Sequence, residues 1–242
     1  MGAVVSAGIG RSFRGLRHEA YGAGRAARKA AMALALVLAA GAAAADEVVI
    51  AALGDSLTQG YGLPQEQGLV PTLEAWLEAR GHDVRLVNAG VSGDTTAGGL
   101  SRVGWTLTDE VDGMIVALGG NDLLRGIAPE VARENLTGIL EAAEGAGVEV
   151  LLAGLEAPGN YGPDYKRDFE AIYSDLAERF GALLYPDMLA ALRQAQDAGA
   201  TLPELMQPDG IHPNAQGVAR IVAAMGPQVE ALIGRIEGGA GG

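Results

Sequence analysis

The sequence predicts an α/β domain with three layers, α/β/α, built around a five-stranded parallel sheet. Short apolar runs rich in β-branched residues alternate along the 242-residue chain with longer segments that have a helical period. This alternation is typical of parallel sheets, in which a helix connects each strand to the next. The apolar runs lack the in-out alternation of a one-sided sheet, which indicates that helices cover both faces.

The elements can be placed along the chain in order. Five segments are expected to be strands: Val48–Leu53, Val84–Val87, Met114–Leu118, Val148–Leu152 and Ala182–Tyr185. The main helices are expected at Val70–Ala79, Pro129–Ala146, Tyr165–Phe180 and Asn214–Ile236. Three of these helices are followed by a glycine that can end them: Gly81, Gly147 and Gly181. No repeat or linker interrupts the pattern, so residues 46–242 are expected to form one domain.

Residues 1–45 have the layout of a secretory signal peptide. Basic residues precede an apolar run from Ala30 to Ala40, and small residues continue to Ala45. That run is too short to span a bilayer and no later segment comes closer, so an integral membrane protein is not expected. The predicted location is the periplasm or the cell exterior, with a mature chain that starts at Asp46. An uncleaved anchor and a misplaced start codon remain as alternatives.

The charge and the absence of cysteine exclude several classes of protein. Removal of residues 1–45 takes away six of the 17 Lys and Arg but only Glu19 of the 30 acids, so the formal charge moves from −13 to −18. Such a surface repels phosphate backbones, and a nucleic-acid partner is not expected. With no cysteine, disulfides, thiolate nucleophiles and Cys-ligated zinc are excluded. No cofactor or metal is expected, and the chain is predicted to be a monomer or weak homo-oligomer.

A serine follows the first predicted strand directly, in the segment Gly54–Thr58. Ligands of open α/β sheets bind at the carboxyl ends of the strands. Gly54 permits a tight turn that places Ser56 at the start of the next helix, where the helix N-terminus favours a developing negative charge. A serine in this position is either a nucleophile or only a helix cap, and position alone does not separate the two.

The histidines favour the nucleophile. Residues 46–242 contain only His82 and His212, and a serine hydroxyl needs a neighbouring base to react at neutral pH. His82 lies in a polar turn and is expected to be exposed. Asp209 stands three residues before His212, so its carboxylate can reach the far imidazole nitrogen and fix the tautomer. Taken alone this pair could be a surface turn, but together with Ser56 it predicts a Ser-His-Asp triad.

Electrostatic stabilisation of the oxyanion is usually the largest single contribution to the catalysis of acyl transfer. Two glycine-containing loops offer groups that could bind this oxyanion. After the second strand, Gly90 can present an unobstructed backbone N–H. After the third strand, Gly119 and Gly120 can let the Asn121 amide point into the cleft. Loop glycines are more often plain turn formers, and that alternative stays open.

With these residues in place, the chain resembles the SGNH (GDSL) hydrolase family. Its four signature blocks correspond, in order, to Gly54–Leu57, Gly90, Gly119–Asp122 and Asp209–His212. The resemblance implies the flavodoxin-like fold of that family, with Ser56 as nucleophile, His212 as base and Asp209 as its orienting acid. It also implies an oxyanion hole made by the backbone N–H groups of Ser56 and Gly90 and the side chain of Asn121.

The sequences of residues 88–95, 118–122 and 157–162 are similar to those of a bacterial branch of periplasmic thioesterases, lysophospholipases and arylesterases. This resemblance implies a serine esterase that hydrolyses carboxylic esters and acyl thioesters, with a small acyl ester or thioester as substrate. Candidate substrate-binding residues are Asp55, Leu123, Leu155 and Ile211. The three apolar ones could equally be core, which is the commoner fate of leucine.

Other functions fit less well. An α/β-hydrolase would show Gly-x-Ser-x-Gly at its nucleophile turn, and that string is absent from the chain. A carbohydrate O-acetylesterase of the same family is the main alternative, because the same triad could serve it. A non-catalytic binding protein on the same fold is a remote one, since a fold alone does not determine function.

Overall fold

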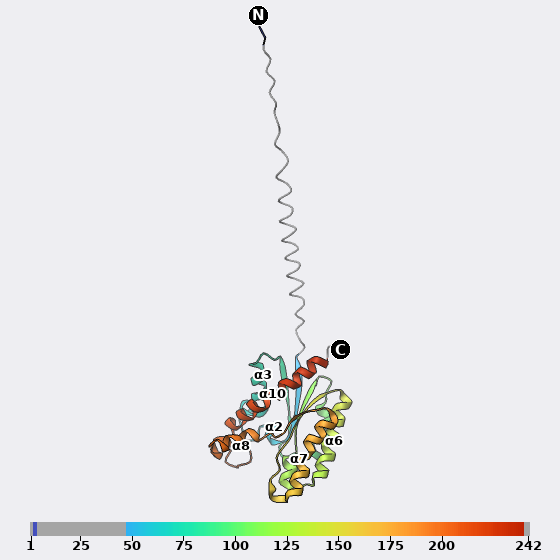
Figure 1. Cartoon of the computed structure of the whole chain (residues 1–242), viewed down its shortest axis with the longest axis vertical. Coiled ribbons are helices and arrows are strands. Elements are labelled where there is room, and N and C mark those ends of the chain that lie inside the picture. The colour runs from blue at the N-terminus through green and yellow to red at the C-terminus, as the bar shows by residue number, and fades with distance from the viewer. Residues whose placement is uncertain (1, 4–46, 240–242) are drawn as a thin grey trace. The chain divides into compact units, whose positions relative to one another are not determined.

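Five parallel strands form the centre of the fold (Figure 1). Their order in the sheet is β2-β1-β3-β4-β5. They are β1 Val48–Gly54, β2 Val84–Gly90, β3 Gly113–Ala117, β4 Glu149–Ala153 and β5 Leu183–Tyr185. This computed structural model describes residues 2–3 and 47–239. The predicted five-stranded parallel sheet is therefore confirmed. The predicted signal peptide falls on a segment that lies outside the described residues, apart from Gly2 and Ala3.

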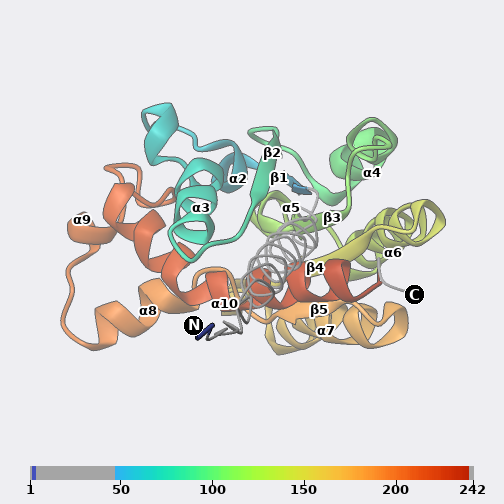
Figure 2. The same cartoon turned by 90° about the horizontal axis from the view of Figure 1, so that it is seen from above.

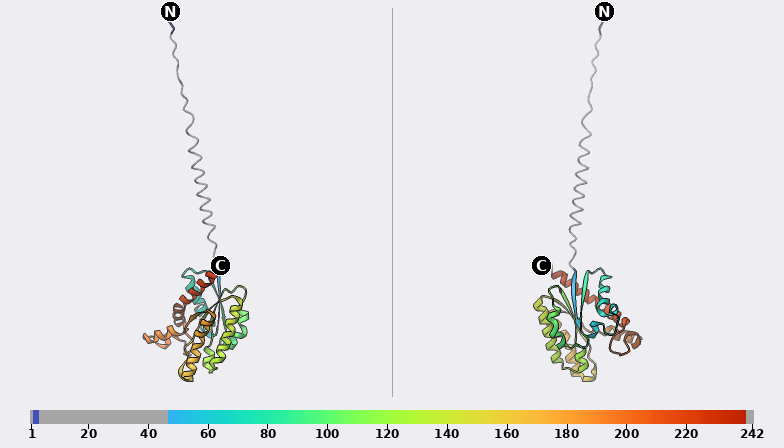
Figure 3. Two further views of the ribbon diagram at one scale, coloured as in Figure 1. Left: turned by 45° about the vertical axis from the view of Figure 1, so that its right-hand side comes forward. Right: turned by 180° about the vertical axis from the view of Figure 1, so that it is seen from behind.

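Helices cover both faces of this sheet, as predicted (Figures 2 and 3). On one face, α4 (Thr96–Thr106) packs beside α6 (Pro129–Ala146), and α6 packs beside α7 (Pro163–Phe180). On the other face, α3 (Leu69–Glu78) packs against α10 (Ala215–Gly239). The central strands β1 and β3 are buried along their whole length because they have strands on both edges and helices on both faces. Within the described residues, no helix is long and apolar enough to cross a membrane.

Strand β2 differs from its predicted bounds because it continues three residues beyond Val87. The added residues Asn88, Ala89 and Gly90 are poor strand formers, so their β propensity did not predict a strand. They stay extended because the ladder with β1 continues to the pair Gly54↔Gly90. Gly90 is therefore the last residue of a strand and not part of the loop that follows.

Helix α4 was not predicted because its glycines, Gly98, Gly99 and Gly104, lower the helix propensity. The helix forms nonetheless, since the Thr95 side chain accepts a hydrogen bond from the Gly98 N–H at its first turn. A Cβ at Gly99 would run into the Leu118 side chain, so this glycine lets α4 approach the sheet closely. The remaining short elements are α2 Ser56–Gln59, η1 Gln65–Gln67, α5 Gly120–Arg125, η2 Gly159–Tyr161, α8 Ala190–Asp197 and α9 Leu202–Leu205.

A buried carboxylate joins α4 to α5 below the carboxyl ends of the strands. Asp122, with none of its surface exposed, accepts hydrogen bonds from the Thr96 backbone N–H at 2.9 Å and the Thr96 hydroxyl at 2.6 Å. The Asn135 amide donates to the same hydroxyl at 3.0 Å. Each polar atom of Thr96 thus has a partner inside the core, and Asp122 fixes how the two helices begin.

Asp122→Ala should lower the free energy of unfolding by about 1–3 kcal/mol, because it leaves the buried Thr96 donors without an acceptor. Urea unfolding followed by circular dichroism measures this loss. The matched control is Asp109→Ala, at an exposed position, which should change the same free energy by less than about 0.5 kcal/mol. Equal effects of the two substitutions would show that the Asp122 contacts contribute nothing specific.

Candidate active site

The turn between β1 and α2 presents Ser56 at the carboxyl edge of the sheet. Asp55 caps α2, and its carboxylate accepts a hydrogen bond from the Leu57 N–H at 3.0 Å. A Cβ at Gly54 would lie 2.9 Å from the carbonyl oxygen of Ala117, so only glycine allows the turn to pass so close to the end of β3. Ser56 is the first residue of α2 and faces the open end of the sheet.

His212 lies within hydrogen-bond reach of this serine, and Asp209 lies within reach of His212. The Nε2 atom of His212 is 2.9 Å from the Ser56 Oγ, and its Nδ1 atom is 2.7 Å from Asp209 Oδ2. The other carboxylate oxygen, Oδ1, accepts the backbone N–H groups of Ile211 and His212, each at 3.0 Å. Asp209 is therefore held by its own turn while it contacts the imidazole.

The hydrogen bonds of Asp209 determine the tautomer of the imidazole. The bond from the His212 side chain, followed by the two backbone N–H groups, lowers the pKa of Asp209 from 3.8 to about 2. The carboxylate is thus ionised at neutral pH and can only accept hydrogen bonds. The proton of a neutral imidazole then sits on Nδ1, which leaves the Nε2 lone pair directed at the Ser56 hydroxyl. This is the arrangement in which His212 can take a proton from Ser56.

Tyr61 is a second neighbour of the imidazole, and the sequence analysis missed it. The rings of Tyr61 and His212 are 4.7 Å apart between centroids, with an angle of 40° between their planes. Gln207 donates through Nε2 to the backbone carbonyl oxygens of Tyr61 at 2.8 Å and Pro213 at 3.0 Å. The segment after α2 is thereby tied to the turn that carries His212. No periodicity or motif considered in the sequence marks Tyr61 for this position.

A cavity of about 530 Å³ opens beside Ser56 and His212. All four candidate substrate-binding residues lie on its wall: Asp55, Leu123, Leu155 and Ile211. Leu123 and Leu155 are each only 8% exposed and also pack in the hydrophobic core, whereas Ile211 is 51% exposed. The two leucines therefore serve as core and cavity wall together. The apolar wall can accommodate a hydrocarbon chain next to the serine hydroxyl.

Asn121 lies on the same wall, as expected for an oxyanion donor. It stands in the first turn of α5, which follows Gly119 with its positive φ of 118°. Its Nδ2 atom is 3.3 Å from Asp55 Oδ2, so the carboxyl of Asp55 orients the amide. Burial raises the pKa of Asp55, whose two oxygens are occupied by Leu57 N–H and Asn121.

Gly90 does not fit the predicted role of oxyanion donor. Its N–H donates to Asn88 Oδ1 at 3.0 Å, and it is not among the residues that line the cavity. A Cβ at this position would lie 2.7 Å from the Cα of Gln59 and 2.8 Å from the carbonyl carbon of Thr58. Gly90 is a glycine because the end of β2 passes against the backbone of α2.

Gly93, in the loop after β2, has the properties that Gly90 lacks. It lines the cavity and has a positive φ of 84°. Among the residues that the structure describes, none accepts a hydrogen bond from its N–H. With the predicted strand ending at Val87, Gly90 falls in the loop, and for this reason Gly90 was predicted as the donor.

His82, the other histidine of the described chain, is 3.1 Å from Glu230 Oε1 and does not line the cavity. Its side chain is 26% exposed, so the predicted exposed turn is in fact partly covered by α10. Within residues 47–239, no group of three or more histidine and carboxylate side chains is arranged to hold a metal ion.

The sequence of this domain matches a known family over most of its length. A sequence model of the GDSL-like lipase/acylhydrolase family matches residues 52–220. The chain belongs to this family. The predicted family resemblance is thus confirmed.

Individual members of the GDSL family align with nearly all of the described domain. Esterase TesA of Pseudomonas aeruginosa is 38% identical over 201 residues, which cover 83% of this chain and 96% of that protein. The protein named thioesterase 1/protease 1/lysophospholipase L1 of Escherichia coli is 36% identical, covering 79% and 87%. The crystal structure of AlinE4, an esterase of the SGNH-hydrolase family, is 44% identical with a TM-score of 0.62, covering 77% and 97%.

Ionisation of Asp209 should stabilise the fold in a defined pH window. A carboxyl whose pKa is lower in the folded chain stabilises it above the unfolded value, here 3.8, and this contribution disappears as the pH falls through about 2. Wild type should therefore lose more unfolding free energy between about pH 4 and pH 2 than Asp209→Asn does. Urea unfolding of both proteins across this range measures the difference, and parallel pH profiles would contradict the assignment.

Proposed function

We propose that this GDSL-family protein is a serine esterase that hydrolyses carboxylic esters and acyl thioesters through an acyl-enzyme on Ser56. The observation that carries the proposal is the continuous contact from Asp209 through His212 to the Ser56 hydroxyl at the wall of an apolar cavity. A serine that only caps a helix has no need of a histidine oriented by a carboxylate. Relatives named as an esterase, an arylesterase and a thioesterase support the same activity.

Acylation uses the hydrogen bond between Ser56 and His212. The Ser56 Oγ attacks the carbonyl carbon of the substrate while Nε2 of His212 takes the hydroxyl proton. The positive charge that forms on the imidazole is stabilised by the Asp209 carboxylate at 2.7 Å. When the tetrahedral intermediate collapses, the bond to the alcohol or thiol breaks and His212 returns the proton to that leaving group.

The negative oxygen of the intermediate needs donors that are already in place. We assign this role to the backbone N–H groups of Ser56 and Gly93 and to the Asn121 amide. Gly93 replaces Gly90 in this assignment because Gly93 lines the cavity and no described residue accepts a hydrogen bond from its N–H, whereas the N–H of Gly90 donates to Asn88. The Asp55 carboxyl supports the hole indirectly by holding Asn121.

Deacylation repeats the steps with water. His212 removes a proton from a water molecule that attacks the acyl carbon, the Ser56 Oγ leaves and takes the proton back, and the carboxylic acid departs. Apart from the substrate and water, each step uses groups of this chain alone.

The cavity favours an acyl chain over an acetyl group. Leu123, Leu124 and Leu155 contribute a wall that a carbohydrate acetate would leave largely unused. The same apolar surface supports esters and thioesters of longer acids, in line with the lysophospholipase name of the Escherichia coli relative. The carbohydrate O-acetylesterase alternative is therefore the weaker one.

We also propose that the enzyme works in the periplasm or outside the cell. Support comes from the basic, apolar and small-residue zones of residues 1–45, which follow the order of a secretory signal peptide.

Hydrolysis of p-nitrophenyl esters by residues 46–242 tests the activity and ranks the substrates. The value of kcat/KM should rise about fourfold per methylene over short chains, because each buried methylene contributes about 0.8 kcal/mol. Ser56→Ala should abolish hydrolysis, and a chelator should leave wild type unaffected. A rate that is highest for acetate would favour the acetylesterase, and full activity of Ser56→Ala would refute the mechanism.

Asn121→Ala should lower kcat by about two to three orders of magnitude, because it removes one oxyanion donor. The fold should persist, since the side chain is only partly buried. Steady-state kinetics with a medium-chain ester measures the effect, and His82→Ala serves as a control that should keep the wild-type rate. An unchanged kcat for Asn121→Ala would remove this residue from the hole.

A further inference from the structure

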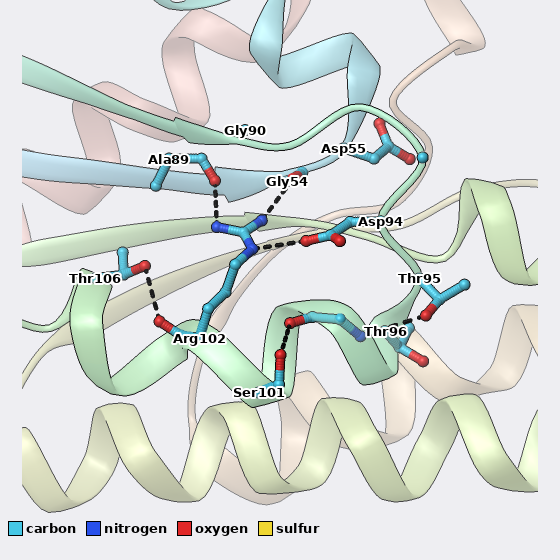
Figure 4. Close-up of polar contacts among 12 residues, drawn as sticks. Gly54, Asp55, Ala89, Gly90, Asp94, Thr95, Thr96, Ser101, Arg102 and Thr106 are labelled. Carbon is cyan, nitrogen blue, oxygen red and sulfur yellow. Dashed lines mark hydrogen bonds and ion pairs between the residues drawn. The ribbon is translucent and has the colours of Figure 1, made fainter.

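Arg102 of α4 contacts two backbone carbonyl groups and one carboxylate near the carboxyl ends of β1 and β2 (Figure 4). Its Nη2 atom donates to the carbonyl oxygen of Gly54 at 2.8 Å, and its Nη1 atom to that of Ala89 at 2.6 Å. Its Nε atom donates to Asp94 Oδ2 at 2.6 Å. The side chains of this ion pair are only 15% and 18% exposed, so solvent does not compete freely for the contacts.

Two of the three contacts lie beside the proposed catalytic donors Ser56 and Gly93. Gly54 ends β1 two residues before Ser56, and Ala89 lies near the end of the neighbouring β2. Asp94 directly follows Gly93, whose N–H we assign to the oxyanion hole. One guanidinium therefore joins the strand that leads into the nucleophile to the loop that presents a second oxyanion donor.

We propose that Arg102 is a positioning residue that sets the separation between Ser56 and the Gly93 N–H. This inference rests on the proposed esterase function. Oxyanion donors act only when they lie about 2.7–3.1 Å from the oxygen that develops charge, so a small shift of the Gly93 loop weakens the hole. The pair Arg102–Asp94 opposes that shift because it anchors the loop to the ends of β1 and β2.

The Val91 backbone N–H also links the loop to β1, because it donates to the Gly54 carbonyl oxygen at 3.0 Å. The other side-chain contacts on the loop are more exposed and do not reach β1. Arg125 donates to the Gly93 carbonyl oxygen at 2.8 Å, and the Ser92 hydroxyl donates to Gln59 Oε1 at 2.9 Å. Both of these bonds lie in exposed surroundings. Arg102 differs from them because the same group also holds the last carbonyl of β1.

Arginine suits this position better than lysine. The planar guanidinium directs its N–H donors in fixed directions and can meet three acceptors at once, whereas an ammonium is a compact point charge on a flexible stem. Asp94 balances the charge, so the partly buried cation is paired.

A hollow of about 310 Å³ between α4 and the strands β1 and β2 is lined by Arg102 and Ala89, among others. Removal of the Arg102 side chain would connect its vacated space to this hollow. A small guanidinium ion could then enter and contact the same carbonyl oxygens, which permits a test by chemical rescue.

Arg102→Ala should lower kcat for a medium-chain p-nitrophenyl ester about 100-fold with KM within about threefold, because misplaced donors weaken the transition state more than the bound substrate. Millimolar methylguanidinium should restore a measurable part of that rate. Asp94→Asn should lower kcat in the same sense, by about 10-fold, and it tests the inference if Arg102→Ala does not fold. The control is Arg85→Ala on β2, where the Arg85 side chain is 42% exposed and pairs with Glu47 and Glu110. This variant should retain the wild-type kcat, and methylguanidinium should not change that rate.

Folded Arg102→Ala or Asp94→Asn with kcat within about threefold of wild type would overturn the inference. So would a loss that appears only in KM, or one that methylguanidinium leaves unchanged in folded Arg102→Ala. Wild type is measured in the same assay: if it hydrolyses no ester, the proposed function itself fails, whereas an active wild type with unaffected variants refutes only the role of Arg102.

Discussion

The parallel register of β1 with its two neighbours constrains everything built at the carboxyl edge of the sheet. The ladder sets Gly54 beside Gly90 on one side and beside Ala117 on the other. Three strand ends and the first turn of α2 share this space, and glycines are needed where a Cβ would meet backbone. The serine, the Gly93 loop and the Asn121 helix all start from these three ends, so their mutual distances follow from the register.

The proposed catalytic groups combine a buried frame with an accessible acid. Asp122 and Arg102 use buried or partly buried polar contacts to hold the helices and loops. Asp209, in contrast, keeps 37% of its side chain exposed and depends on hydrogen bonds from its own turn to stay ionised. The site thus obtains a strongly acidic carboxyl without the desolvation that burial would bring, because each of its oxygens accepts N–H groups.

Much of this was predictable from the sequence, and the failures have physical causes. The strands and the helices α3, α6, α7 and α10 were found because apolar periodicity survives in any packing, and Asp209-x-x-His212 was found because its geometry is local. Helix α4 was missed because packing and capping outweigh its glycines. Gly93 was missed because the length of β2 is set by its ladder with β1. Tyr61 was missed because it contacts His212 in space but lies far from it in the sequence.

Asp209 and His212 lie in one short turn, which its own hydrogen bonds hold together. The turn keeps its internal geometry when it moves, so the acid and the base travel together as one part. Ser56 belongs to a second part that is built into the sheet. The Ser56–His212 hydrogen bond, the Tyr61 ring and the Gln207 side chain connect the two parts. Substitutions or heating that shift one part relative to the other will therefore first change the distance between the Ser56 hydroxyl and the His212 imidazole.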